Sequence, residues 1–408
     1  MATLAPPIGH TRLWTRNFGL YFVARSVALL GDGMLPVAVA LAVRGAGYGA
    51  SGVGYVLAAW MTPLVLLILF GGVFADRFTP RRMMIGADVV RVGTQAVVAA
   101  ALLSGRPSLG LMIAMSALAG AATAMFEPGV KSMVPRVSED AQRANATLRV
   151  ADAVAQLAGP ALSATLIAAV GAGMVYVVNA GTFAVSAVCL LALRLAPAPP
   201  PEQAVGMLRN LREGWREFRS RTWMWTTIVI FMARGMLVFA PVYPLGSGLV
   251  TDRLGEQAYG WVLSALGGGT ILGGLIAMRY RPRRPLAAGS VALFGFALIP
   301  LSYAVHAPLA GLIALHVLGG AAWAFWSVVW STSVQTQVPP DVLNRVIAYE
   351  VAGSVGCIPI GQALAGPVAG LVGAEAVLGF GAVVGVACCV AQLAVPAIRN
   401  LRRVADQP

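Results

Sequence analysis

Ionisable side chains stand inside long apolar stretches of this 408-residue chain. If such a stretch crosses a membrane, an ionised carboxylate at the bilayer centre costs about 2.5–3.5 kcal/mol, so it requires a partner, a water-filled space or a proton. Asp32 follows Gly31 about 15 residues into the first stretch, and Arg25 lies seven residues earlier on the same helical face. Because burial favours the neutral form of an acid, we regard Asp32 as the first candidate for a proton or substrate site. A hydrogen-bonded packing acid is the alternative.

Three further charges lie in apolar stretches. Asp88 and Arg91 are one helical turn apart, so they either neutralise each other or form a relay coupled to Asp76. Arg234 has no acid near it in sequence, so it must face a cavity or pair across a helix bundle. We expect Asp32 to be its partner.

Aromatic and polar side chains elsewhere suggest a cavity wall. Trp323, Trp326 and Trp330 share one helical face and either surround flat hydrophobic or cationic compounds, or serve in packing or in an aromatic belt at the membrane interface. His316 is either a hydrogen-bonded core residue or part of a proton relay, and Glu127 is either an interfacial cap or a cavity acid.

A charged hairpin ends the second apolar stretch, at residues 71–82. Asp76 can accept hydrogen bonds and pair with basic groups in one conformation and not in another, as a gate requires. Gly72 belongs to the same segment, and Arg77, Arg81 and Arg82 are either partners of this gate or ordinary determinants of topology.

The hairpin recurs about 200 residues later, at residues 273–284, which indicates two related halves. Asp152 and Glu350 occupy similar places after Val-Pro turns in the two halves, and Gly159-Pro160 corresponds to Gly366-Pro367. We interpret the two acids as latches between the halves, or as members of local ion pairs. Since six helices separate the copies, the repeat is parallel, about an axis along the membrane normal.

Composition indicates the elements that must position these residues. The chain is 58% hydrophobic and only 11% charged, whereas soluble domains carry about 25% charge. Apolar segments of spanning length recur throughout. They predict an all-α membrane protein of twelve helices at 17–43, 51–74, 83–104, 108–126, 149–170, 172–194, 223–247, 258–280, 286–306, 308–333, 345–372 and 375–398.

Most of the 29 basic residues fall in the two tails and the even-numbered turns. This asymmetry predicts that both termini are cytoplasmic, and it argues against nucleic acid as the partner of the +13 net charge. We expect a six-helix bundle over 1–196, a cytoplasmic linker with an amphipathic helix over 197–222, and a second six-helix bundle over 223–408. No metal or nucleotide motif is found, so we expect no cofactor.

These motifs resemble the major facilitator superfamily (MFS). The hairpin Gly72-x-x-x-Asp76-Arg77, with Arg81 and Arg82, is similar to the superfamily signature between helices 2 and 3. Gly31-Asp32 and the run beginning Phe126-Glu127-Pro128 are similar to patterns of bacterial proton-antiporter exporters of drugs and siderophores. The second hairpin departs from the signature, with Met278 where the acid is expected.

The resemblance implies a multi-pass protein of the bacterial inner membrane that works by alternating access. Its expected function is efflux of small amphipathic compounds, as in multidrug resistance, by proton antiport, with membrane lipids as surroundings and a monomeric state. An enzyme is not expected. The alternatives are an uptake carrier, a flippase for a lipid-like solute, or a membrane sensor that transports nothing.

Overall fold

The computed structural model describes residues 13–68, 79–195 and 207–403, which are almost entirely helical. Within these ranges 12 helices are long and apolar enough to cross a membrane. The first six are α1 (Arg16–Gly45), α2 (Gly49–Ile68), α4 (Pro80–Leu103), α5 (Leu109–Val137), α6 (Ala141–Val170) and α7 (Ala172–Leu191). The prediction of an all-α, twelve-helix membrane protein is therefore confirmed.

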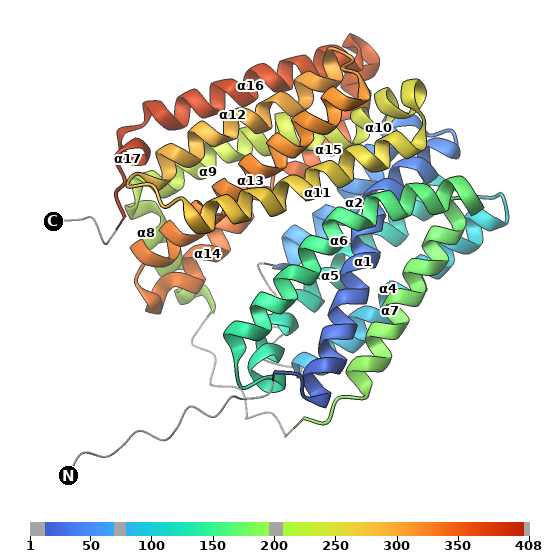
Figure 1. Cartoon of the computed structure of the whole chain (residues 1–408), viewed down its shortest axis with the longest axis horizontal. Coiled ribbons are helices and arrows are strands. Elements are labelled where there is room, and N and C mark those ends of the chain that lie inside the picture. Colours follow the sequence, from blue (N-terminus) through green and yellow to red (C-terminus); the bar gives the residue numbers. More distant parts are fainter. Residues whose placement is uncertain (1–12, 69–78, 196–206, 404–408) are drawn as a thin grey trace.

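The second set begins after the amphipathic helix α8 (Met207–Ser220). It comprises α9 (Thr222–Arg234), which continues through the π-helical turn η1 (Gly235–Phe239) into α10 (Ala240–Leu254), then α11 (Glu256–Arg279), α12 (Pro285–Ala304), α13 (Leu309–Gln337), α14 (Pro340–Val355) with α15 (Ile358–Val372), and α16 (Ala374–Ala394). A short α17 (Pro396–Arg399) follows. Figure 1 shows α1 to α7 gathered in one group and α9 to α16 in the other.

Several helices extend beyond the apolar segments that the sequence marks. α5 runs to Val137 and α6 starts at Ala141, where the side chain of Asp140 accepts a hydrogen bond from the Arg143 amide. An apolar window misses such ends because a helix that leaves the membrane continues with polar residues and closes with a side-chain cap. Gly171 and Gly373 end α6 and α15 with φ of 84° and 90°, a region that favours glycine.

The two groups contact each other mainly through two helix crossings, α6 with α11 and α2 with α15. Both crossings are made of small residues. A methyl group on Gly267 would meet the backbone of Gln156, and one on Gly366 would meet the backbone of Ser51. Such residues let helix backbones approach where lipid provides no hydrophobic drive.

The contacts between the groups lie towards the end of the molecule that carries the α1–α2 turn. There Arg44 at the end of α1 forms an ion pair of 2.6 Å with Asp252 of α10, and the Ala161 amide donates to Ser264 Oγ at 3.0 Å. We call this the closed end. At the opposite end, where α8, α14 and the start of α1 lie, the two groups diverge (Figure 1).

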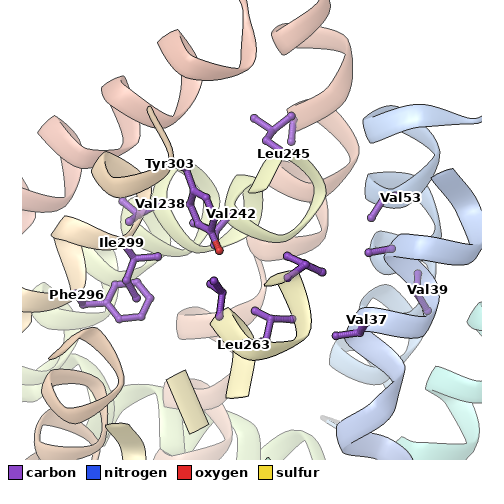
Figure 2. Packing of buried hydrophobic residues seen from close by; sticks show 14 of the residues in the cluster. Val37, Val39, Val53, Val238, Val242, Leu245, Leu263, Phe296, Ile299 and Tyr303 are labelled. Atoms are coloured by element: carbon purple, nitrogen blue, oxygen red, sulfur yellow. The ribbon is translucent and has the colours of Figure 1, made fainter. Parts of the chain in front are cut away.

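The largest cluster of buried hydrophobic side chains draws on both groups. Figure 2 shows part of it, with Val37 of α1 and Val53 of α2 on one side and Leu263 of α11 and Val242 of α10 on the other. The core near the closed end is thus shared between the two groups of helices.

Candidate functional site

Three adjoining chambers, which together we call the central space, lie in the middle of the molecule: two between the two groups of helices and one within the first group. The largest, of about 530 Å³, is lined by Trp60 and Leu57 of α2 and mostly by residues of α9, α13 and α14. A second chamber of about 360 Å³ lies between α1, α6, α10 and α11, and a third of about 300 Å³ lies within the first group of helices. Pro36 lines all three, so the chambers adjoin one another, and their volumes fall in the range of small-molecule sites.

Asp32 lines the second and third chambers. Both of its carboxylate oxygens accept hydrogen bonds from Nη2 of Arg91 on α4, at 2.5 and 2.6 Å. The Asp32 side chain remains 34% exposed, whereas that of Arg91 is 2% exposed. An ionisable group open to the cavity is therefore held by a cation that is not.

Arg91 has a second acid behind it. Its Nη1 lies 3.5 Å from Oδ1 of Asp88, whose side chain is fully buried and accepts a hydrogen bond of 2.6 Å from Ser186 of α7. The guanidinium also lies 3.7 Å from the centroid of the Phe183 ring, a favourable cation–π contact. One cation is thus shared by two carboxylates, and the group carries a net negative charge when both are ionised.

The glycines beside Asp32 explain how α1 presents it. A methyl group on Gly31 would overlap the side chains of Asn179 and Thr182 of α7, and one on Gly33 would lie 2.6 Å from the Ala155 carbonyl of α6. α1 therefore lies against both helices at this level, and Asp32 is held where it reaches both Arg91 and the cavity.

Arg25 and Glu127 form a second pair in the same group of helices. Their Nη2 and Oε1 atoms are 3.1 Å apart, and Glu127 lines the third chamber. The guanidinium carbons of Arg25 and Arg91 both lie over the Phe126 ring, 5.5 and 5.4 Å from its centroid. The structure thus assigns Arg25 to Glu127 rather than to Asp32.

The tryptophans of α13 form an aromatic wall of the largest chamber. Trp326 stacks on Trp330 with centroids 5.8 Å apart and on Phe231 at 5.2 Å, and Trp323 contacts Phe239 at 4.9 Å. All of these side chains line the chamber. They therefore combine the packing and the cavity roles that the sequence left open.

Glu350 and Asp152 also face the central space. Glu350 lines the largest chamber and accepts a 2.9 Å hydrogen bond from the Trp330 indole of the same half, whereas Asp152 lines the second chamber. Within the described residues neither acid forms an ion pair, so the structure shows no salt bridge between the halves at these positions.

Arg234 lies away from this network, at the junction of α9 and the π-helical turn. It is fully buried, with Nη2 3.1 Å from Cys389 Sγ and 3.4 Å from the Gly385 carbonyl, both on α16. Its Nε and Nη1 have no hydrogen-bond partner in the described part of the chain. Asp32 is paired instead with Arg91, because α1 and α4 both pack on α7 whereas Arg234 faces α16.

His316 lines the second chamber but is held by neighbours on both sides of its ring. Nδ1 is 2.7 Å from the Leu312 carbonyl, so it carries the proton, and Nε2, 2.8 Å from the Tyr303 hydroxyl, accepts. In the neutral ring, this arrangement fixes the tautomer with the proton on Nδ1.

Gly72, Asp76 and Arg77 of the expected gate lie outside the described residues. Arg81, at the start of α4, donates to the carbonyl groups of Leu190 and Leu191 at 2.8 and 2.6 Å. It therefore caps the C-terminus of α7, where a cation is favoured. Arg82 is exposed.

Ser186 and Phe183, which complete the surroundings of Asp88 and Arg91, were not predicted from the sequence, and neither was the Arg44–Asp252 pair at the closed end. Arg44 carried a signal, since it is one of few basic residues in the odd-numbered turns. Nothing in the sequence spacing predicts its contact with Asp252, which lies more than 200 residues away.

The helix pairs, the central space and the buried charges define a membrane transporter of the twelve-helix class. The family model described as Major Facilitator Superfamily matches residues 21–349. The chain belongs to this superfamily. It is therefore a multi-pass transporter and not an enzyme.

Known proteins similar to the chain agree with this class. It is 28% identical over 380 residues to the "Multidrug efflux pump Tap" of Mycolicibacterium fortuitum, covering 88% of this chain and 90% of that protein. It is 25% identical over 382 residues to the "Enterobactin exporter EntS" of Citrobacter koseri, covering 90% of this chain and 89% of that protein. The crystal structure of the nucleoside transporter NupG superposes with a TM-score of 0.72 at 14% identity, covering 92% of this chain and 98% of that one.

Proposed function

We propose that this protein exports small amphipathic organic compounds across the bacterial cytoplasmic membrane in exchange for protons. The similarity to proteins named as an efflux pump and an exporter supports the direction. The aromatic wall and the size of the central space support an amphipathic substrate.

The observation that carries proton coupling is the sharing of Arg91 between Asp32 and Asp88. When Asp32 binds a proton it releases Arg91, whose charge Asp88 still balances. A buried arginine without any counter-ion would make protonation of Asp32 costly. The second acid removes that cost, so Asp32 can take up and release protons while Arg91 stays in place.

Coupling also requires that the cavity opens to one side at a time. The contacts between the groups of helices at the closed end, including Arg44–Asp252, would break as the halves rock, and contacts at the other end would form. From the resemblance we assign the gate of that second end to Asp76 and its arginine partners. The halves that rock are the bundles 1–196 and 223–408, joined by the segment 197–222.

Proton flux in sealed inverted vesicles with an acidic interior tests the proposal. A panel of hydrophobic dyes, antibiotics and siderophores is added one compound at a time, with vesicles that lack the protein as the control. Proton release that depends on a compound is expected, and Asp32→Asn should abolish it. Accumulation of a compound with no proton release would contradict antiport and favour an uncoupled carrier or a flippase. Binding of a compound without transport would favour a sensor.

A further inference from the structure

Among the described residues, the walls of the central space carry negative charges and no positive ones. Across the three chambers the acidic lining residues are Asp32, Glu127, Asp152 and Glu350, and no arginine or lysine among the described residues lines any of them. Arg91 and Arg25 contact their acids but do not themselves line the chambers. A solute in this space therefore meets carboxylates rather than cations.

The carboxylates differ in whether they are already neutralised. Asp32 is paired with Arg91 and Glu127 with Arg25. Glu350 instead has a single neutral donor, the Trp330 indole at 2.9 Å, and forms no ion pair within the described residues. Desolvated carboxylates are costly without a counter-charge, so an ionised Glu350 attracts one from the cavity.

Aromatic side chains line the same chamber as this acid. Trp330 holds Glu350 and stacks on Trp326, which stacks on Phe231 with an angle of 18° between the ring planes. These rings and Trp323 line the same chamber as Glu350. The negative faces of aromatic rings attract organic cations, most strongly where water is excluded. A carboxylate beside such faces is a site for a delocalised or bulky monovalent cation.

We propose that Glu350 and the aromatic wall around it form a subsite that selects lipophilic monovalent cations as substrates. The inference rests on the proposed function for the claim that these ligands are substrates, and it names their class. Asp152, in the adjoining chamber, adds to the negative potential. The subsite is separate from Asp32, which exchanges the proton.

Ligands of one shape and different charge test the subsite directly. Equilibrium dialysis of the purified full-length protein in detergent measures binding of tetraphenylphosphonium, its anionic counterpart tetraphenylborate, and neutral triphenylphosphine oxide. Detergent without protein serves as the blank. The wild-type protein should bind the phosphonium at least about tenfold more tightly than the borate. Equal affinity for the two ions, or no binding of the phosphonium, would overturn the proposal without any variant.

Substitution then assigns the selectivity to one residue. Glu350→Gln should weaken phosphonium binding about tenfold or more and leave binding of the neutral oxide within about threefold. Glu350→Asp should restore part of the phosphonium affinity. Glu256→Gln, which removes an exposed glutamate at the start of α11, is the matched control and should bind the phosphonium like the wild type. Unchanged phosphonium affinity in Glu350→Gln would overturn the assignment.

The binding assay separates this inference from proton antiport. If phosphonium binding depends on Glu350 but no compound drives proton release in vesicles, the subsite stands and the proposed antiport fails. If antiport is observed and the Glu350→Gln variant still binds and exports the phosphonium like the wild type, the subsite fails and the antiport stands.

Discussion

Replacement of Arg91 by methionine would leave the Asp88 carboxylate fully buried without a cation. Methionine keeps much of the apolar volume beside Phe183 but removes the charge that both Asp32 and Asp88 contact. Removing one partner of a buried ion pair destabilises a protein by about 3–5 kcal/mol. We expect a loss of that size in the free energy of unfolding, because the Asp88 side chain is 0% exposed and, within the described part of the chain, only Ser186 supplies it with a further hydrogen bond.

The pH dependence of this loss follows from the same reasoning. Without Arg91, the Asp88 carboxyl group stays buried only if it binds a proton. The free-energy cost of binding that proton increases with pH, by up to about 1.4 kcal/mol per pH unit. The deficit of Arg91→Met relative to the wild type should therefore be larger at pH 8 than at pH 5. Removing the acid as well, in Asp88→Asn/Arg91→Met, should recover at least half of the lost stability.

Unfolding by sodium dodecyl sulfate in mixed micelles, followed by tryptophan fluorescence, measures these differences. The single and double variants and Asp88→Asn alone complete a double-mutant cycle. An Arg91→Met protein as stable as the wild type, or a double variant no more stable than Arg91→Met, would refute the idea that Arg91 is the necessary counter-ion of Asp88.

Two further predictions concern the closed end. Gly267→Leu should hold α6 and α11 apart and lower transport at least about tenfold, whereas Gly274→Leu, whose added side chain begins in open space, should transport normally in the same vesicle assay. Asp252→Ala breaks the exposed Arg44–Asp252 pair, which is worth about 0.2–1 kcal/mol. Distances between spin labels across the closed end should then become modestly longer. The charge exchange Arg44→Asp/Asp252→Arg should reverse this change. An unchanged distance distribution in Asp252→Ala would contradict a role of the pair in holding this end closed.

Much of the architecture was predictable because a bilayer imposes strong rules on sequence. Spanning helices need about 20 apolar residues, so the twelve segments were recognisable from hydropathy alone. The helix ends beyond the membrane were not, because α5 and α6 continue through polar residues to the Asp140 cap. The break between α14 and α15 was also not predicted, although Gly356 follows α14 and Pro359 stands in the first turn of α15, residue types that favour a helix end and a helix start.

The residues of the candidate site could be predicted from the sequence, but most of the contacts between them could not. The spacing of Asp88 and Arg91 placed them on one helical face, and the structure shows their contact. Asp32 bonds to Arg91 of another helix, 59 positions along the chain, and Glu350 bonds to the indole of Trp330 in the preceding spanning helix. Such partners depend on how helices cross, which one sequence does not specify.

Proton antiport through Asp32 requires that this residue gives up a proton when substrate occupies the cavity. Its most direct test is the pH change when a transported compound is added to the purified protein in lightly buffered detergent solution. The wild type should release protons in proportion to the compound bound, and Asp32→Asn should bind the compound and release none. Equal proton release from Asp32→Asn and the wild type would contradict this role of Asp32.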